Sequence, residues 1–207
     1  MPDKPYWAND CLRGICFWLG HRYANYPFYH LGEAAIVGEL CNLLNARLKR
    51  NERLLCEVYY KNMGLQLGES RADLVIIDSE GSTKRGDDVT KHLKCVIEVK
   101  RAENDDTMLR RDLYRLKLLQ AALKDKIEAI GFYLLIVSQR SRPSGLFVTE
   151  EGYGYNQPQS LKYDDKETGE VHTISYRTPC VSKASSTFQD SAIESAYYSV
   201  LVEVLNS

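Results

Sequence analysis

Three charged side chains stand in runs whose other residues predict buried strands. Asp73 lies in RADLVIID (71–78), and Glu98 and Lys100 lie in KCVIEVKR (94–101). Side chains alternate between the two faces of a strand, so Glu98 and Lys100 share one face. If the two strands pair with residue 73 near residue 98, two carboxylates and an ammonium meet at one spot on the sheet.

Such a cluster is suited to phosphodiester hydrolysis. Two carboxylates close together repel, and one takes up a proton unless a cation lies between them. Mg²⁺, or Mn²⁺ in its place, would resolve this repulsion, because Mg²⁺ prefers oxygen ligands and keeps waters that can act as nucleophiles. Lys100 could then orient or deprotonate the attacking water and offset charge on a phosphate. The alternative is that Glu98 and Lys100 are exposed edge residues that pair with other charges.

A glutamate on a predicted helix is a further candidate. Apolar residues at helical spacing predict a helix over 30–50, and Glu33 falls near the middle of its apolar face. A buried carboxylate needs a cation, a network of donors or a cleft. The alternative is a first-turn glutamate favoured by the helix dipole. Glu39, outside the apolar stripe, and Glu57, in the run 54–60, are other acidic candidates, although Glu57 could equally have a structural role.

The periodicity of the chain predicts the elements that position these residues. The segments with helical character are 8–22, 30–50 and 104–126, the last of which opens with capping residues and carries Leu109, Leu113, Leu116 and Leu123 at helical spacing. The short apolar runs that predict strands are 54–60, 71–78, 94–101 and 130–139. The polar connection between the second and third runs predicts that they pair as a hairpin.

The C-terminal part of the chain is less regular. The segment from Ser141 to Lys162 is rich in Gly, Tyr, Pro and Gln and predicts a long loop. A hairpin through Thr168 and Gly169 is expected next, followed by a final helix from about Ser191 to Leu205. We therefore expect one α/β domain over 1–207, in which a central mixed sheet is flanked by helices.

Composition limits the setting and the partners. The chain has 207 residues, is 44% hydrophobic and carries a formal net charge of -1, so any binding of nucleic acid requires a local basic patch. Its six cysteines lack the short paired spacings of a zinc site and are expected to be reduced core residues. With no leader-like N-terminus and no run of membrane length, we expect a cytoplasmic protein without membrane association. The four histidines lack the spacing of zinc hydrolases.

The run RADLVIID followed by CVIEVKRA resembles the core of the PD-(D/E)XK nucleases, the restriction-endonuclease-like superfamily. In that family an acidic residue begins the pattern on one strand and E-x-K lies on the next. Asp73 fills the first position, and Glu98, Val99 and Lys100 supply the second. Ala72 stands where the proline of the motif name would be. The resemblance covers about residues 30–140 and leaves 141–207 as an extension of loop, hairpin and helix.

The resemblance implies a role for each site residue. Asp73, Glu98 and the main-chain carbonyl of Val99 would bind the metal, Lys100 would position the water, and Glu33 would bind the metal directly or through water. It also implies a metal-dependent endonuclease acting on DNA, while the chemistry alone does not distinguish DNA from RNA. The alternatives are a non-cleaving module on this fold that binds DNA or protein, and a sequence-specific restriction endonuclease, which usually needs a dimer.

Other polar side chains could support substrate binding. The helix after E-x-K carries two lines of basic residues, Arg110, Lys117 and Lys124 on one and Arg111 and Arg115 on the other. Such lines can follow phosphates, although a solvated helix face is the simpler interpretation. Some nucleases of this superfamily carry polar side chains on this helix near the site, so Asp112, Arg115 and Gln120 are candidates to contact and orient the site residues. The loop with Tyr153, Tyr155, Asn156 and Gln157 could stack on unpaired bases or be an ordinary surface loop.

Overall fold

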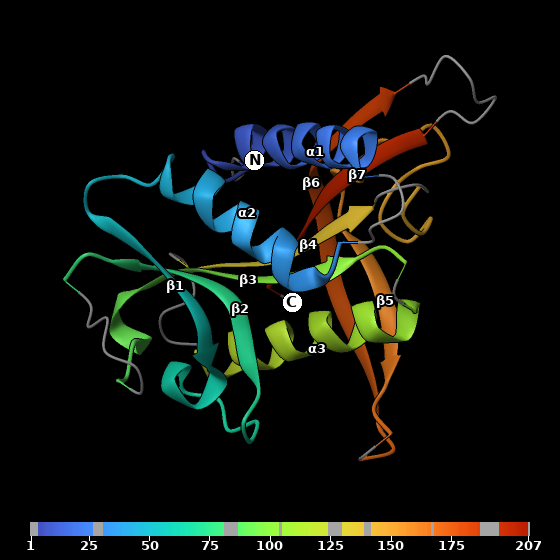
Figure 1. Ribbon diagram of the computed structural model, residues 1–207. Coiled ribbons are helices and arrows are strands. Elements are labelled where there is room, and N and C mark those ends of the chain that lie inside the picture. Colours follow the sequence, from blue (N-terminus) through green and yellow to red (C-terminus); the bar gives the residue numbers. More distant parts are fainter. Residues whose placement is uncertain are drawn as a thin grey trace.

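The predicted strand runs become neighbours in one sheet of the computed structural model (Figure 1). The structure describes residues 4–26, 31–80, 87–103, 105–123, 130–138, 142–166, 168–186 and 195–206. The first four strands are β1 (Glu52–Tyr59), β2 (Arg71–Asp78), β3 (Leu93–Arg101) and β4 (Gly131–Ser138). β2 is antiparallel to both of its neighbours, β1 and β3, and β4 runs parallel to β3. The predicted pairing of 71–78 with 94–101 is confirmed.

The C-terminal part of the chain completes the same sheet, and the predicted final helix is wrong. Ser195–Val204 forms β7, which lies between β4 and β6. β5 (Gln159–Asp164) and β6 (Val171–Ser186) form the predicted hairpin through Thr168 and Gly169. The strand order is β1-β2-β3-β4-β7-β6-β5. The residues predicted as an appended loop, hairpin and helix therefore supply three of the seven strands of the sheet. The predicted loop, Ser141 to Lys162, is too long at its end, because β5 begins at Gln159.

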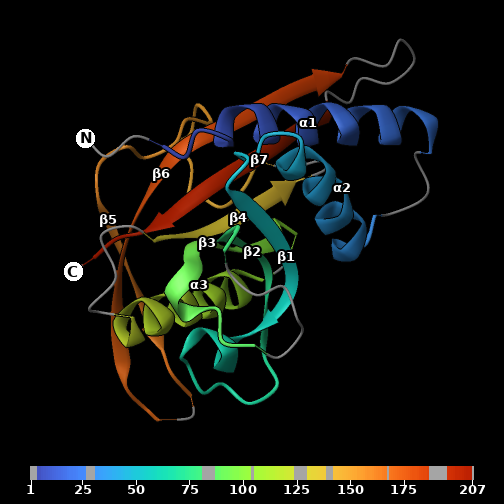
Figure 2. The same ribbon diagram turned by 90° about the vertical axis from the view of Figure 1, so that its left-hand side faces the viewer.

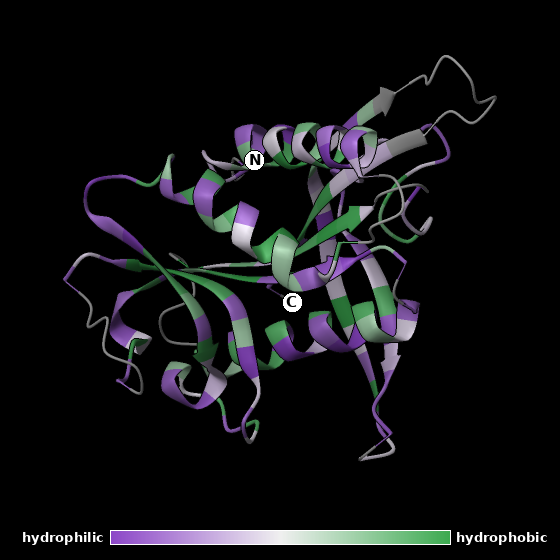
Figure 3. Ribbon diagram, viewed as in Figure 1, coloured by the Kyte–Doolittle hydropathy of each residue, from purple (hydrophilic) through white to green (hydrophobic). Residues whose placement is uncertain are grey.

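Helices cover both faces of this mixed α/β sheet, as Figures 1 and 2 show. α1 (Ala8–Asn25) and α2 (Glu33–Asn45) pack on one face of the sheet. α3 (Asp106–Ala122), which follows β3 and precedes β4 in the chain, packs on the other face. Figure 3 shows hydrophobic residues concentrated in the central strands and hydrophilic ones on the outer sides of the helices. α2 is shorter than the predicted 30–50, and it buries Ile36, Leu40 and Leu44.

The predicted third helix is confirmed, and its local interactions explain its position. The Asp105 side chain caps the helix by accepting a hydrogen bond from the Thr107 N–H at 3.1 Å. The predicted apolar positions, which include Leu109 and Leu116, are buried against the sheet. Because β3 and β4 are parallel, the chain between them must cross one face of the sheet, and α3 is that crossover.

The cysteines differ in part from the expectation. Cys11, Cys16, Cys95 and Cys180 are buried free thiols, as predicted. Cys56 on β1 is exposed and Cys41 on α2 is half-buried, so the prediction of core positions is wrong for this pair. Their Sγ atoms lie 3.3 Å apart. No helix among the described residues is both long enough and apolar enough to cross a bilayer.

The central place of β7 gives a stability prediction. Leu201 of β7 is fully buried, so Leu201→Ala should lower the free energy of unfolding by about 2–5 kcal/mol through lost burial and a cavity. Phe17→Ala on α1 is the control, because the Phe17 side chain is 81% exposed and its loss should change stability by less than about 0.5 kcal/mol. Urea unfolding measures both. Equal small effects would show that β7 is a peripheral appendage.

Candidate active site

The candidate site lies where β2 and β3 separate. The last paired residues on this side are Leu74 and Ile97, and the next residue of each strand is Asp73 and Glu98. Beyond that point Asp73 Oδ2 accepts a hydrogen bond from the Val99 N–H at 2.7 Å. The Asp73 carboxylate thus replaces the backbone carbonyl of a paired strand as the acceptor for the Val99 N–H. The sheet opens here without leaving that donor unpaired.

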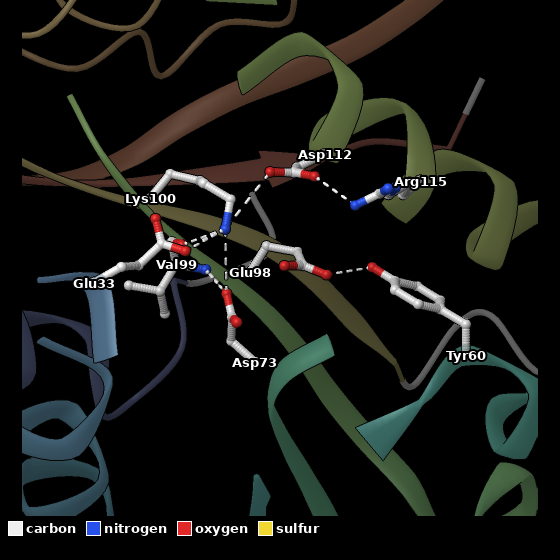
Figure 4. A network of polar contacts seen from close by, with 8 residues as sticks. All are labelled: Glu33, Tyr60, Asp73, Glu98, Val99, Lys100, Asp112 and Arg115. Carbon is white, nitrogen blue, oxygen red and sulfur yellow. Dashed lines mark hydrogen bonds and ion pairs between the residues drawn. The ribbon is translucent and has the colours of Figure 1, made fainter. Parts of the chain in front are cut away.

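Lys100 lies at the centre of the site, as Figure 4 shows. Its Nζ is 2.8 Å from Glu33 Oε1 and 2.8 Å from the Val99 carbonyl oxygen. It also lies 3.6 Å from Asp73 Oδ2 and 3.7 Å from Asp112 Oδ2. Burial by itself lowers the pKa of Lys100, but Asp73, Glu33 and Asp112 outweigh burial and raise the pKa to about 12. Lys100 is therefore an ammonium at neutral pH.

Glu33 and Asp112 approach Lys100 from opposite faces of the sheet. Glu33 is the first residue of α2, and its side chain is 35% exposed. Of the surroundings expected for it, a cation, a network of donors or a cleft, the structure supplies a cation, Lys100. It also lies in the first turn of the helix, as the alternative interpretation predicts. Asp112 belongs to the buried face of α3. The gap between β2 and β3 therefore gathers groups from both helical layers.

Glu98 is almost completely buried beside this network, and its carboxyl is held from another direction. The Tyr60 hydroxyl donates a hydrogen bond to Glu98 Oε1. Tyr60 begins the short 3-10 helix η1 (Tyr60–Met63) and is itself fully buried. Burial, followed by the charges of Asp73 and Asp112, raises the pKa of Glu98 well above its usual range. A proton on Glu98 relieves the repulsion among these carboxyl groups.

Asp112 has one oxygen satisfied and one left without a hydrogen bond. Oδ1 accepts a hydrogen bond from Arg115 Nη1 at 3.1 Å. Oδ2 is buried and makes no hydrogen bond, and Lys100 Nζ lies 3.7 Å from it. Burial raises the pKa of Asp112, while Lys100 and Arg115 oppose this shift. A buried carboxylate oxygen without a donor marks a place where additional positive charge would be stabilising.

The charges around Lys100 do not balance. The site contains four carboxyl groups, those of Glu33, Asp73, Glu98 and Asp112, and two cations, Lys100 and Arg115. If all four carboxyl groups ionised, two negative charges would remain uncompensated. The protein can relieve this surplus by protonation, as at Glu98, or by binding a cation.

The sequence located most of this site. The structure brings Glu33, Asp73, Glu98 and Lys100 together with the Val99 carbonyl, whereas their roles in metal binding and catalysis stay predictions. Tyr60 was missed, because its run carries no signal that separates it from an ordinary core strand. Asp112 and Arg115, predicted to support the site, contact it. Gln120, the third residue of that group, donates to the Val204 carbonyl at the other end of α3.

The other acidic candidates lie outside this network. Glu39 accepts a hydrogen bond from Asn42 on its own helix. Glu57 has a φ of 55°, a left-handed conformation that costs about 1–3 kcal/mol in a non-glycine residue. Its exposed side chain forms an ion pair with Arg71 at 3.7 Å. Glu33 is therefore the candidate that accompanies Asp73 and Glu98.

Tyr155 and Arg110, both predicted as possible substrate contacts, make hydrogen bonds within the fold. The Tyr155 hydroxyl donates to the carbonyls of Gly145 and Val148, so it holds its own loop. Tyr153 is exposed, with the Lys183 ammonium 5.1 Å from its ring centroid. Of the basic residues on the two predicted lines, Arg110 donates to the Lys162 carbonyl, and Lys124 lies outside the described residues.

The donor set fits a hard divalent cation by its chemistry. Its members are carboxylate oxygens and one backbone carbonyl, which are the ligands that Mg²⁺ prefers. In the described part of the chain, no three His, Cys, Asp or Glu side chains are arranged to hold a metal ion. The Lys100 ammonium occupies the space between the carboxylates, and Glu98 is bonded to Tyr60. The unsatisfied Asp112 oxygen shows that Lys100 does not meet the whole demand for positive charge.

Comparison with known proteins does not identify the chain. No protein-family model, no curated protein and no solved structure matches it. Membership of the PD-(D/E)XK superfamily stays a prediction, and any functional assignment depends on the geometry of the site.

The buried carboxyl of Glu98 gives a pH-dependent stability prediction. Because its pKa is raised in the folded chain, its contribution to stability is complete below the ordinary carboxyl pKa of 4.5 and is lost as pH rises through the folded value. Glu98→Gln keeps an acceptor for Tyr60 and removes this loss. Towards the upper end of the pH range between 4.5 and the raised folded pKa of Glu98, the Glu98→Gln variant should therefore be more stable than the wild type by on the order of 1 kcal/mol or more.

Thermal and urea unfolding between pH 4 and pH 8, without divalent cations, measure the difference in unfolding free energy between Glu98→Gln and the wild type. Its expected size at the higher pH is on the order of 1 kcal/mol. Glu39→Gln, a substitution of the same type outside the Lys100 network, serves as the control and should follow the wild type. A Glu98→Gln variant that becomes less stable than the wild type as pH rises would show that the ionised carboxylate stabilises the fold.

Proposed function

We propose that this chain is a metal-dependent nuclease that hydrolyses phosphodiester bonds, with DNA as its first candidate substrate. The observation that supports this most strongly is the coordination of the Lys100 ammonium by the Val99 carbonyl, Glu33 and Asp73. These are oxygen atoms that the resemblance to PD-(D/E)XK nucleases assigns to the metal. A position built from them attracts a cation and retains a surplus of negative charge. We infer that β1–β4, with α2 and α3, is a restriction-endonuclease-like core.

Asp73, Glu98 and the Val99 carbonyl would hold Mg²⁺ or Mn²⁺, with Glu33 as a further ligand, directly or through water. When bound, such an ion makes water a better nucleophile at neutral pH and offsets charge on the phosphate. Glu98 must be ionised to be a ligand, so it must give up the proton that its raised pKa favours. Tyr60 continues to orient it by donating to Oε1.

Lys100 acts in this proposal as a donor and a positive charge. With its pKa raised to about 12, it keeps its proton at neutral pH. As an ammonium it can orient the attacking water, or a phosphate oxygen, by donating a hydrogen bond. Asp112 holds the ammonium from the α3 side, and Arg115 fixes Asp112.

The same contacts favour a second candidate, a binding module that does not cleave. Lys100 already neutralises part of the carboxylate cluster, as a structural ion pair would. In such a module Lys100 would occupy the cation position permanently, and the protein would bind little metal. Metal binding and cleavage separate the two functions.

Cleavage of supercoiled plasmid, linear duplex and single-stranded DNA with Mg²⁺, Mn²⁺ or EDTA tests the proposal. The wild type should cleave in the presence of metal, and Asp73→Ala and Lys100→Ala should each reduce the rate by about 100-fold or more. Lys61→Ala, which removes an exposed lysine paired with Glu69, should leave the rate unchanged. A folded wild type that cleaves none of these substrates would favour the binding module.

Metal binding can be measured without cleavage. Mn²⁺ should bind the wild type in electron paramagnetic resonance titrations and stabilise it by about 2.7 kcal/mol at a concentration 100 times the Kd. Asp73→Ala removes a carboxylate that would bind the metal, so it should abolish both effects. Glu69→Gln, an exposed carboxylate elsewhere, should preserve them. Identical Mn²⁺ binding by the wild type and Asp73→Ala would exclude Asp73 as a ligand.

A further inference from the structure

A groove of about 630 Å³ lies on the outer face of α3, the side turned away from the sheet. One wall is the segment 66–70, which leads from η1 to β2, and the other is the end of the β5–β6 hairpin, with Tyr163 and Lys166. The floor is provided by α3, with Arg111, Tyr114 and Arg115. The groove is thus made from three segments that are far apart in the sequence.

The groove adjoins the candidate active site through one residue. Arg115 lines the groove, and its Nη1 is 3.1 Å from Asp112 Oδ1. Asp112 Oδ2 is in turn 3.7 Å from Lys100 Nζ. A ligand that contacts Arg115 from the groove therefore lies one side chain away from the network around Lys100.

The charged lining can bind anions along part of the groove. Arg111, Arg115 and Lys166 give three positive charges, and Asp164 and Asp165 give two negative ones. The two arginines both belong to α3, whereas the aspartates lie on the hairpin wall. Arginine suits phosphate because its guanidinium donates two parallel hydrogen bonds. The guanidinium groups of α3 and the Lys166 ammonium at the end of the hairpin are therefore the phosphate-binding groups of the groove.

The hairpin wall offers aromatic rings that are already fixed in position. Tyr114 stacks on Tyr163 with ring centroids 4.7 Å apart and on His172 at 4.6 Å, with interplanar angles of 26° and 27°. The Tyr114 hydroxyl is also hydrogen bonded to His172 Nε2 at 3.0 Å. Tyr163 and His172 are cross-strand partners in β5 and β6. Aromatic side chains held in this way can take a base without losing much side-chain freedom.

We propose that this groove binds an unpaired segment of the nucleic-acid substrate, with phosphates on Arg111 and Lys166 and a base against Tyr163. A volume of about 630 Å³ is typical of sites for small organic ligands, so the groove accepts one or two nucleotides and not the width of a duplex. The nature of this ligand rests on the proposed nuclease function. Arg115 and the buried Asp112 lie between this segment and Lys100.

Fluorescence anisotropy in EDTA tests the groove without cleavage. The probes are a labelled single-stranded thymidine oligonucleotide and a labelled duplex of equal length. Arg111→Ala should weaken binding of the single strand by about fivefold to tenfold and reduce the slope of log K against log salt by about 0.7, the contribution of one phosphate contact. Lys166→Ala should act in the same direction. Arg111 is exposed, so its replacement should leave the fold intact.

Arg110→Ala is the matched control, because it removes the same charge from the adjacent residue of α3. Arg110 lies outside the groove and donates to the Lys162 carbonyl, so its loss should change single-strand affinity by less than about twofold. Equal effects of Arg110→Ala and Arg111→Ala would overturn the proposal, as would equal affinity of the wild type for single strand and duplex.

Cleavage by the same variants separates this inference from the proposed function. If the wild type cleaves DNA and Arg111→Ala binds and cleaves like it, the groove is not a substrate site and the nuclease function stands. If the wild type does not cleave but binds the single strand in an Arg111-dependent way, the groove stands and the nuclease function fails.

Discussion

The site depends on how the protein compensates buried negative charge. Four carboxyl groups converge where β2 and β3 separate, and the Lys100 ammonium lies among them. Ionised carboxylates are costly to remove from water unless cations or donors surround them. Lys100, Arg115, the Val99 N–H and the Tyr60 hydroxyl supply these contacts. These contacts come from β3, α3 and η1, so the three elements must be placed together to provide them.

The topology explains how these parts meet. The parallel connection of β3 to β4 forces α3 across one face of the sheet, and its buried side carries Asp112 to Lys100. α2 packs on the opposite face, yet its first residue reaches the same ammonium through the opening between the strands. The C-terminal hairpin then adds a wall beside α3. The site and the groove are therefore products of the whole sheet and not of the E-x-K strand alone.

The sequence predicts local patterns well and distant pairings poorly. The β-branched runs of the sequence predict β2 and β3. The register between these strands follows if Asp73 and Glu98 are required to lie close together. The helix predicted over this segment is wrong although β7 carries aromatic and β-branched residues typical of strands, among them Tyr197, Val200 and Val202. Its pairing with β4, for example Leu134 with Val202, joins segments distant in the chain, which the sequence does not predict.

The partners of the site show the same limit. Asp112 was a weak candidate because many helices carry an aspartate, and only tertiary packing turns it towards Lys100. Tyr60 gave no signal, since its hydroxyl matters only after η1 brings it to Glu98. Cys56 was placed in the core because its run is apolar, although β1 is an edge strand with an exposed side.

The hydrogen bond from the Val99 N–H to Asp73 makes that aspartate part of the sheet as well as part of the site. An acceptor is therefore needed at position 73 whatever the chemistry of the site, because the N–H of β3 would otherwise be buried without a partner. Position 98 carries a different requirement, since the fully buried Tyr60 hydroxyl needs an acceptor there and a glutamine would supply one without the buried carboxyl whose pKa is raised. Among related chains we expect aspartate to persist at position 73 and glutamine to be tolerated at position 98.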